Sequence, residues 1–243
     1  AVHYFEDNRT LNPHNKAHIT GTSSAGSAVA VACGALPVAL ATQTAGSIIR
    51  PASFCGVFGF KPSFGALDRT GVLKTNDTLD TIGFMGKDID ILVKSFFSLY
   101  QSTEDYPLSK QYLLNYRNKN KNIPNVLVLG DQFNQFSEYD EYIKEDFADI
   151  TNFMNTRFKV IDVPNEELNF LNNIHQSHQA IYDKSLSYYF IEESKIHEKI
   201  SPVMSQIIKR GEQVKKEDYI GELRRQIEYT NLFNTILKKY DID

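Results

Sequence analysis

The stretch from Ile19 to Ile49 contains no charged residue, and this run constrains the fold more than any other feature of the sequence. Glycine, serine, threonine and alanine dominate it, Pro37 interrupts it, and the large hydrophobic residues that a membrane span needs are sparse. Small uncharged residues allow backbone segments to pack closely, and their hydroxyl groups can line a pocket. The run therefore predicts a tightly packed protein interior next to a polar site.

The remaining pattern predicts an α/β fold, because helical spacing and short apolar runs alternate along the chain. A strand, a helix and a second strand follow one another after residue 124, which is typical of a βαβ unit with parallel strands. We expect one domain over residues 1–243, with a core in 1–86 and the βαβ unit and a helical continuation in 87–243. The expected strands are 37–41, 57–60, 125–130 and 158–163. The expected helices are 27–33, 88–100 (capped by Asp88), 139–156 and a helical region over 166–240. That region is expected to break near Ser201-Pro202 and Gly211 and to end with a helix over 216–240.

Composition excludes several classes of function. Lys and Arg number 26 against 30 Asp and Glu, a net charge of −4, so a basic nucleic-acid surface and a polybasic membrane segment are not expected. The two cysteines fit a reducing compartment, which predicts a cytoplasmic location. No spacing typical of a metal site occurs, and we expect neither a metal nor a cofactor.

Two serine-rich turns carry the densest chemical signal. Ser47 follows a predicted strand and Gly46, so a bent backbone can expose its hydroxyl, while the amides of Thr44, Ala45, Gly46 and Ser47 can stabilise an oxyanion. Ser23 and Ser24 precede a helix, whose first amides are unpaired donors. The alternative is that both serine groups only make turns and N-caps. A phosphate cradle and a G-x-S-x-G elbow are disfavoured because their motifs are absent.

Three segments together resemble the amidase signature family: residues 21–27, residues 44–63 and residues 79–83. The resemblance implies a mixed sheet covered by helices on both faces. It also implies a Ser–Ser–Lys triad with Ser47 as nucleophile, Ser23 as bridging serine and residues 44–47 as oxyanion hole, with Ser24 and Gln43 at the substrate. The implied reaction is hydrolysis of a small-molecule amide through an acyl-enzyme, in which a lysine that burial keeps neutral accepts the proton.

The sequence departs from the family pattern at several positions of the two turns. Ala25 and Ala45 stand where glycine is common, which is tolerable if their φ angles are negative. Gln43 stands where an acidic residue is frequent, and Arg50, shifted by one position, is expected to anchor the turn rather than bind substrate.

No lysine of the chain matches the position of the family's base. Lys16 lies in a polar loop, and Lys61 is better explained as structural. We therefore expect an internal piece, about half of a full enzyme, that lacks the base lysine and is weakly active or inactive by itself.

Three functions remain open from the sequence. The first is a stand-alone amidase, which the segment Ile48–Pro51 favours. The second is the amidase-like subunit of a tRNA-dependent amidotransferase, which releases ammonia for a partner. The third is a non-catalytic module that retains the fold. The identity of the amide and the oligomeric state, a homodimer included, are not predicted.

Overall fold

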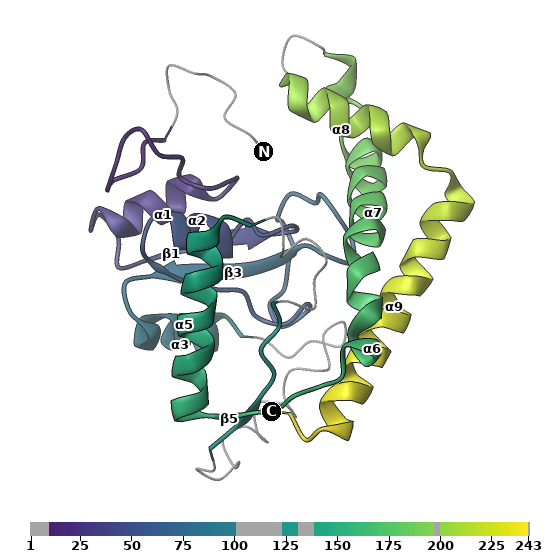
Figure 1. Ribbon diagram of the computed structural model, residues 1–243. Helices are drawn as coiled ribbons and strands as arrows, with labels where there is room; N and C mark the ends of the chain where they lie inside the picture. Colours follow the sequence, from purple (N-terminus) through teal and green to yellow (C-terminus); the bar gives the residue numbers. More distant parts are fainter. Residues whose placement is uncertain (1–9, 101–122, 131–138, 197–199, 243) are drawn as a thin grey trace. The chain divides into compact units, whose positions relative to one another are not determined.

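The computed structural model describes residues 10–100, 123–130, 139–196 and 200–242 (Figure 1). These residues form two compact units. The first comprises the described residues within 1–118 and 182–213, and the second those within 119–181 and 214–243. In the described ranges, no helix combines the length and the apolar character that crossing a membrane requires.

The first unit is built on a three-stranded antiparallel sheet of β1 (Val38–Gln43), β3 (Thr81–Gly86) and β2 (Phe58–Phe60), in that order. The register pairs Phe84 with Leu40 on one side and with Phe60 on the other. The central strand β3 was not among the predicted strands. Its Gly83 and Gly86 weaken the strand pattern, yet Gly83 is required: a Cβ there would lie 2.2 Å from the carbonyl oxygen of Phe60.

Helices cover both faces of this sheet, as the resemblance implied (Figure 1). Successive residues of a strand point to opposite faces. Met85 accordingly packs with α1 (Ala25–Ala32) and α2 (Ile49–Phe54), whereas Phe84 packs with α3 (Ile89–Leu99). The first face buries Ala28, Val31, Ala41, Ile48, Ala52, Cys55 and Met85, and the second buries Leu67, Phe84 and Leu92.

The N-terminal cap of α3 is confirmed. Asp88 has an extended backbone, and its Oδ1 accepts a hydrogen bond from the Ile91 amide at 2.8 Å. This bond satisfies one of the amides that lack a partner in the first turn of a helix.

The first unit also contains the end of α7 (Ile174–Tyr189), the short helix η4 (Glu193–Lys195) and α8 (Pro202–Gln213). The predicted break at Pro202 is confirmed as the start of α8, and the break predicted near Gly211 follows Gln213, because α8 continues two residues past the glycine before α9 begins. A Cβ at Gly211 would lie 2.0 Å from the carbonyl oxygen of Asp183 on α7. This glycine permits a close helix–helix contact instead of ending a helix.

The second unit contains the predicted βαβ unit. Strands β4 (Asn125–Val126) and β5 (Lys159–Val160) pair in parallel, and α5 (Glu141–Arg157) connects them along the chain. Both strands are shorter than the predicted ranges, since only two residues of each are paired. Helices α6 (Asn165–Leu168), η3 (Asn169–Asn173) and α9 (Lys216–Lys239) complete the unit, whose core buries Val163, Leu168, Leu171 and Ile236.

Candidate active site

The turn between β1 and α2 carries Ser47. β1 ends at Gln43, and α2 begins at Ile49. Between them Gly46 has a φ of +93°, a left-handed conformation that only glycine adopts without strain. Ser47, the next residue, is half-buried. The bent backbone predicted before the serine is therefore present.

Gln43 closes this turn. Its side-chain Oε1 accepts hydrogen bonds from the amides of Ile48 at 2.9 Å and Ile49 at 3.1 Å, and the Arg50 amide donates to the Gly46 carbonyl at 2.9 Å. The Gln43 oxygen thus joins the end of β1 to the start of α2. Its predicted place at the substrate stays a prediction.

The amides inside the turn are available. Within the described ranges, the N–H groups of Ala45, Gly46 and Ser47 have no hydrogen-bond acceptor. Three successive donors without an acceptor, in the turn that carries a serine, can supply the hydrogen bonds that an oxyanion needs if they point to one position. The oxyanion-hole role of residues 44–47 remains a prediction that this geometry favours.

The second serine turn lies against the same elements. Ser24 Oγ donates to the Thr42 carbonyl of β1 at 3.3 Å. Gly21, with a φ of +92°, packs so closely on α2 that a Cβ there would lie 2.5 Å from Pro51 Cα. The Ser23 turn is therefore held beside β1 and α2, the two elements that flank Ser47.

The two predicted catalytic hydroxyls are not engaged elsewhere. Ser23 is exposed, and neither it nor Ser47 has a side-chain hydrogen-bond partner among the residues that the structure describes. Neither hydroxyl caps its helix, so the capping part of the alternative loses its support, whereas the part that assigns both serines to turns is untouched. The contact between the two hydroxyls stays a prediction.

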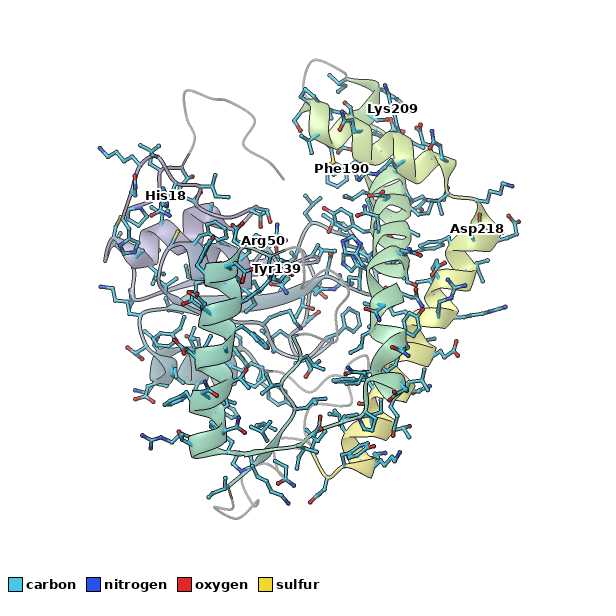
Figure 2. All side chains as sticks on the ribbon, in the orientation of Figure 1. His18, Arg50, Tyr139, Phe190, Lys209 and Asp218 are labelled. Carbon is cyan, nitrogen blue, oxygen red and sulfur yellow. The ribbon has the colours of Figure 1, made fainter. Side chains whose placement is uncertain are left out.

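The departures from the family pattern are accommodated in the turns. Asp241 is the only non-glycine residue with a positive φ in the described ranges, so Ala25 and Ala45 need no left-handed backbone. Arg50, labelled in Figure 2, places its guanidinium against Gly46: Nη2 would lie 3.4 Å from a Cβ there. This contact agrees with an anchoring role for Arg50.

Neither lysine weighed from the sequence reaches the serines through a hydrogen bond. Lys16 is exposed in its loop. Lys61 donates through Nζ to the Pro62 carbonyl at 2.7 Å, and burial lowers its pKa from the ordinary value. This local contact fits the structural role expected for Lys61.

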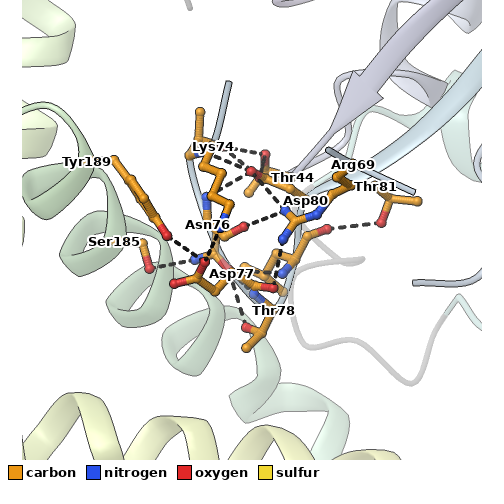
Figure 3. A network of polar contacts seen from close by, with 12 residues as sticks. Thr44, Arg69, Lys74, Asn76, Asp77, Thr78, Asp80, Thr81, Ser185 and Tyr189 are labelled. Atoms are coloured by element: carbon orange, nitrogen blue, oxygen red, sulfur yellow. Dashed lines mark hydrogen bonds and ion pairs between the residues drawn. The ribbon is translucent and has the colours of Figure 1, made fainter. Parts of the chain in front are cut away.

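Sequence reasoning missed Asp80, whose carboxylate supports the Ser47 turn through Thr44. Asp80 is buried, and its Oδ1 accepts a hydrogen bond from the Thr44 hydroxyl at 2.5 Å (Figure 3). The only sequence signal was its place in the stretch 79–83, to which no role had been assigned. In the described ranges, no group of three His, Cys, Asp or Glu side chains is placed to hold a metal ion.

Two tyrosines of α7 stand near this acidic region. Burial, followed by the charges of Asp183 and Asp80, raises the pKa of Tyr182. Burial also raises the pKa of Tyr189 to about 12, helped by the hydrogen bond from its hydroxyl to Asp77. Both shifts favour the protonated phenol, and the Tyr189 hydroxyl donates its proton to Asp77 Oδ1.

Replacing Gly46 by alanine tests the turn geometry. We expect a loss of about 1–2 kcal/mol in the free energy of unfolding, because alanine must adopt the φ of +93°. Gly26→Ala is the matched control: Gly26 lies in α1 with open space around it, so alanine there should stabilise the helix by about 0.5–1 kcal/mol. Chemical denaturation of both variants measures the difference, and equal effects would contradict the left-handed turn.

Comparison with known proteins agrees with this architecture. A family model described as Amidase matches residues 4–242. Among solved structures, one titled as the crystal structure of amidase matches with a TM-score of 0.76 at 24% identity, covering 92% of this chain and 48% of that one. The A subunit of the Glutamyl-tRNA(Gln) amidotransferase from Thermotoga maritima matches with a TM-score of 0.70 at 21% identity, covering 95% and 51%.

Sequence similarity is higher but more local. The A subunit of the Glutamyl-tRNA(Gln) amidotransferase from Treponema pallidum subsp. pallidum is 45% identical over 103 residues, which are 40% of this chain and 20% of that protein. The chain thus spans about half the length of the solved relatives, and its match covers about a fifth of this curated one.

Proposed function

This chain belongs to the amidase family, and on that premise we propose that it carries the nucleophilic part of an amide-hydrolysing site centred on Ser47. The observation that carries the proposal is the β1–α2 turn, where Gly46 bends the backbone and the amides of Ala45, Gly46 and Ser47 have no acceptor among the described residues. Serine as nucleophile and backbone amides as oxyanion donors are sufficient for acyl transfer once a base is supplied.

The proposed reaction proceeds in two stages. Ser47 Oγ attacks the amide carbonyl carbon, and its proton passes through Ser23 to a neutral lysine. The amides of residues 45–47 stabilise the oxyanion until the C–N bond breaks, and the lysine returns the proton through Ser23 to the leaving amine. Water then attacks the acyl-enzyme and releases the carboxylic acid and the Ser47 hydroxyl.

We place the base lysine outside these 243 residues. Supporting this, Lys16 is exposed and Lys61 is hydrogen-bonded to its neighbour Pro62. For the substrate we propose a small-molecule amide bound beside Ser24 and Gln43, which flank the two serine turns. The free thiols of Cys33 and Cys55 are consistent with the cytoplasmic location that we also propose.

A second candidate function is the A subunit of an amidotransferase that acts on glutamyl-tRNA(Gln). The identity of 45% over 103 residues to such a protein favours it. In that case the same Ser47 chemistry would release ammonia from an amide donor. The protein would then bind partner subunits and a tRNA. The segment Ile48–Pro51, which resembles stand-alone amidases, favours the first candidate.

The test uses the full-length protein that contains this chain. We expect a fluorophosphonate to modify Ser47, as mass spectrometry of the peptide that contains it would detect, and simple amides to be hydrolysed without added subunits. Glutamine hydrolysis that requires co-purified partner subunits would select the amidotransferase. No modification of Ser47 under any of these conditions would contradict both candidates and support a non-catalytic module.

A further inference from the structure

The Asp80 carboxylate collects donors from two segments of the first unit. Its Oδ1 accepts from the hydroxyls of Thr44 at 2.5 Å and Thr75 at 2.7 Å, while its Oδ2 accepts from the amides of Thr75 at 2.8 Å and Asn76 at 2.9 Å. Arg69 Nη1 lies 3.3 Å from Oδ2 (Figure 3). The Asp80 side chain is only 10% exposed and needs such partners, because burying an unpaired charge is costly.

Thr44 is the member of this cluster that belongs to the turn of the candidate active site. It is the first residue after β1, three positions before Ser47. The other end of the turn is held by Gln43, which accepts from the amides of Ile48 and Ile49. The amides of residues 45–47 therefore lie in a turn that is held at both ends. The Thr44 hydroxyl donates to Asp80 at one end, and the Ile48 amide donates to Gln43 at the other.

The loop that presents Asp80 is itself rigidly supported. Asn76 Oδ1 accepts from the amides of Thr78 and Leu79, and its Nδ2 donates to Ser185 Oγ on α7 at 2.8 Å. Arg69 donates to the carbonyl of Asn76 at 2.8 Å. These bonds leave the loop little freedom to follow a movement of the turn, so the loop can serve as a fixed support.

We infer that Asp80 is a positioning residue, which holds Thr44 and thereby keeps the oxyanion donors of residues 45–47 in place beside Ser47. The inference rests on the proposed function. Donors contribute most to an oxyanion when they are already oriented, and a misplacement of about 1 Å can cost about 10²-fold in rate. Asp80 acts through Thr44 and does not touch the substrate.

The sharpest variant is Thr44→Val, which removes the hydroxyl at nearly constant volume and leaves Asp80 its contacts with Thr75, Asn76 and Arg69. Thr44→Ser retains the hydroxyl and is the rescue variant. Thr78→Val is the matched control, because its hydroxyl donates to Asn76 Oδ1 at 3.3 Å in the same network but away from the turn. Equal melting midpoints would show that each variant folds.

Two measurements on the full-length protein test the inference. For Thr44→Val we expect fluorophosphonate modification of Ser47 and kcat to fall about 10–100-fold, with KM nearly unchanged. We also expect hydrogen exchange of the Ile48 and Ile49 amides to accelerate at least about 10-fold, since the turn opens more often. Thr78→Val should behave as the unchanged protein, and Thr44→Ser should recover most of the modification, kcat and protection from exchange that Thr44→Val loses.

Each outcome is decisive. If Ser47 is modified normally in Thr44→Val, or exchange does not change, the positioning role is wrong while the proposed function stands. If the unchanged protein is not modified at Ser47, the proposed function fails. The exchange rates then still decide whether Asp80 holds the turn through Thr44.

Discussion

Replacing Ser47 by alanine should lower amide hydrolysis by at least about 10³-fold, because the residual rate of a hydrolase without its nucleophile comes from binding and the oxyanion donors alone. Modification by a fluorophosphonate should disappear completely. Stability should change by less than about 0.5 kcal/mol, since the half-buried Ser47 side chain makes no hydrogen bond among the described residues. Hydrolysis rates, mass spectrometry and a denaturant titration of the full-length protein measure the three effects.

Ser53→Ala is the matched control for this prediction. Ser53 is an exposed serine on α2, the helix that follows the Ser47 turn, and no chemistry is assigned to it. Its replacement should leave the rate and the modification unchanged. If Ser47→Ala retained more than about a tenth of the activity while Ser53→Ala lost it, the identification of the nucleophile would be wrong.

Replacing Gly211 by alanine should lower the free energy of unfolding by about 2–3 kcal/mol, because one added methyl group overpacks the contact between two helices. The new Cβ would lie 2.0 Å from the Asp183 carbonyl oxygen and 2.8 Å from Ser187 Cβ, so α8 must move away from α7. That movement would strain the paired contact of Arg210 with the buried Asp183, whose shorter N–O distance is 2.7 Å.

Gly221→Ala provides the comparison within the same chain. Gly221 also lies inside a helix, α9, but a Cβ there meets nothing within 4 Å. Alanine should therefore raise stability by about 0.5–1 kcal/mol through its helix propensity. Unfolding midpoints in urea separate the two variants, and stabilisation by both would show that α8 does not pack closely on α7.

Local sequence patterns correctly predicted those helix starts that depend on a residue and its neighbours in the chain. The Asp88 cap of α3 and the start of α8 at Pro202 depend on a residue and its nearest neighbours in the chain. The βαβ unit was predicted for the same reason, but its strands were predicted too long. Pairing ends after two residues in each strand, and an apolar run does not reveal how many of its residues find a partner.

The glycines mark where local reasoning fails. Gly83 weakened the strand signal of β3, and Gly211 suggested the end of a helix, because glycine has low intrinsic propensity for both elements. In the folded chain both glycines permit close backbone approaches, to Phe60 and Asp183 respectively. Such contacts join residues that are distant in sequence, so no spacing pattern contains them.

The chemical groups of the candidate site could be identified from the order of residues: a serine after Gly46 at a strand exit, a second serine turn, and a family resemblance that the match over residues 4–242 confirms. The contacts that support the site became visible in the folded chain. The partner of Thr44 is Asp80, 36 residues away, and Gly21 lies against Pro51. Contacts of this kind depend on distances in space, which the folding of the sheet and helices creates and which the order of residues does not specify.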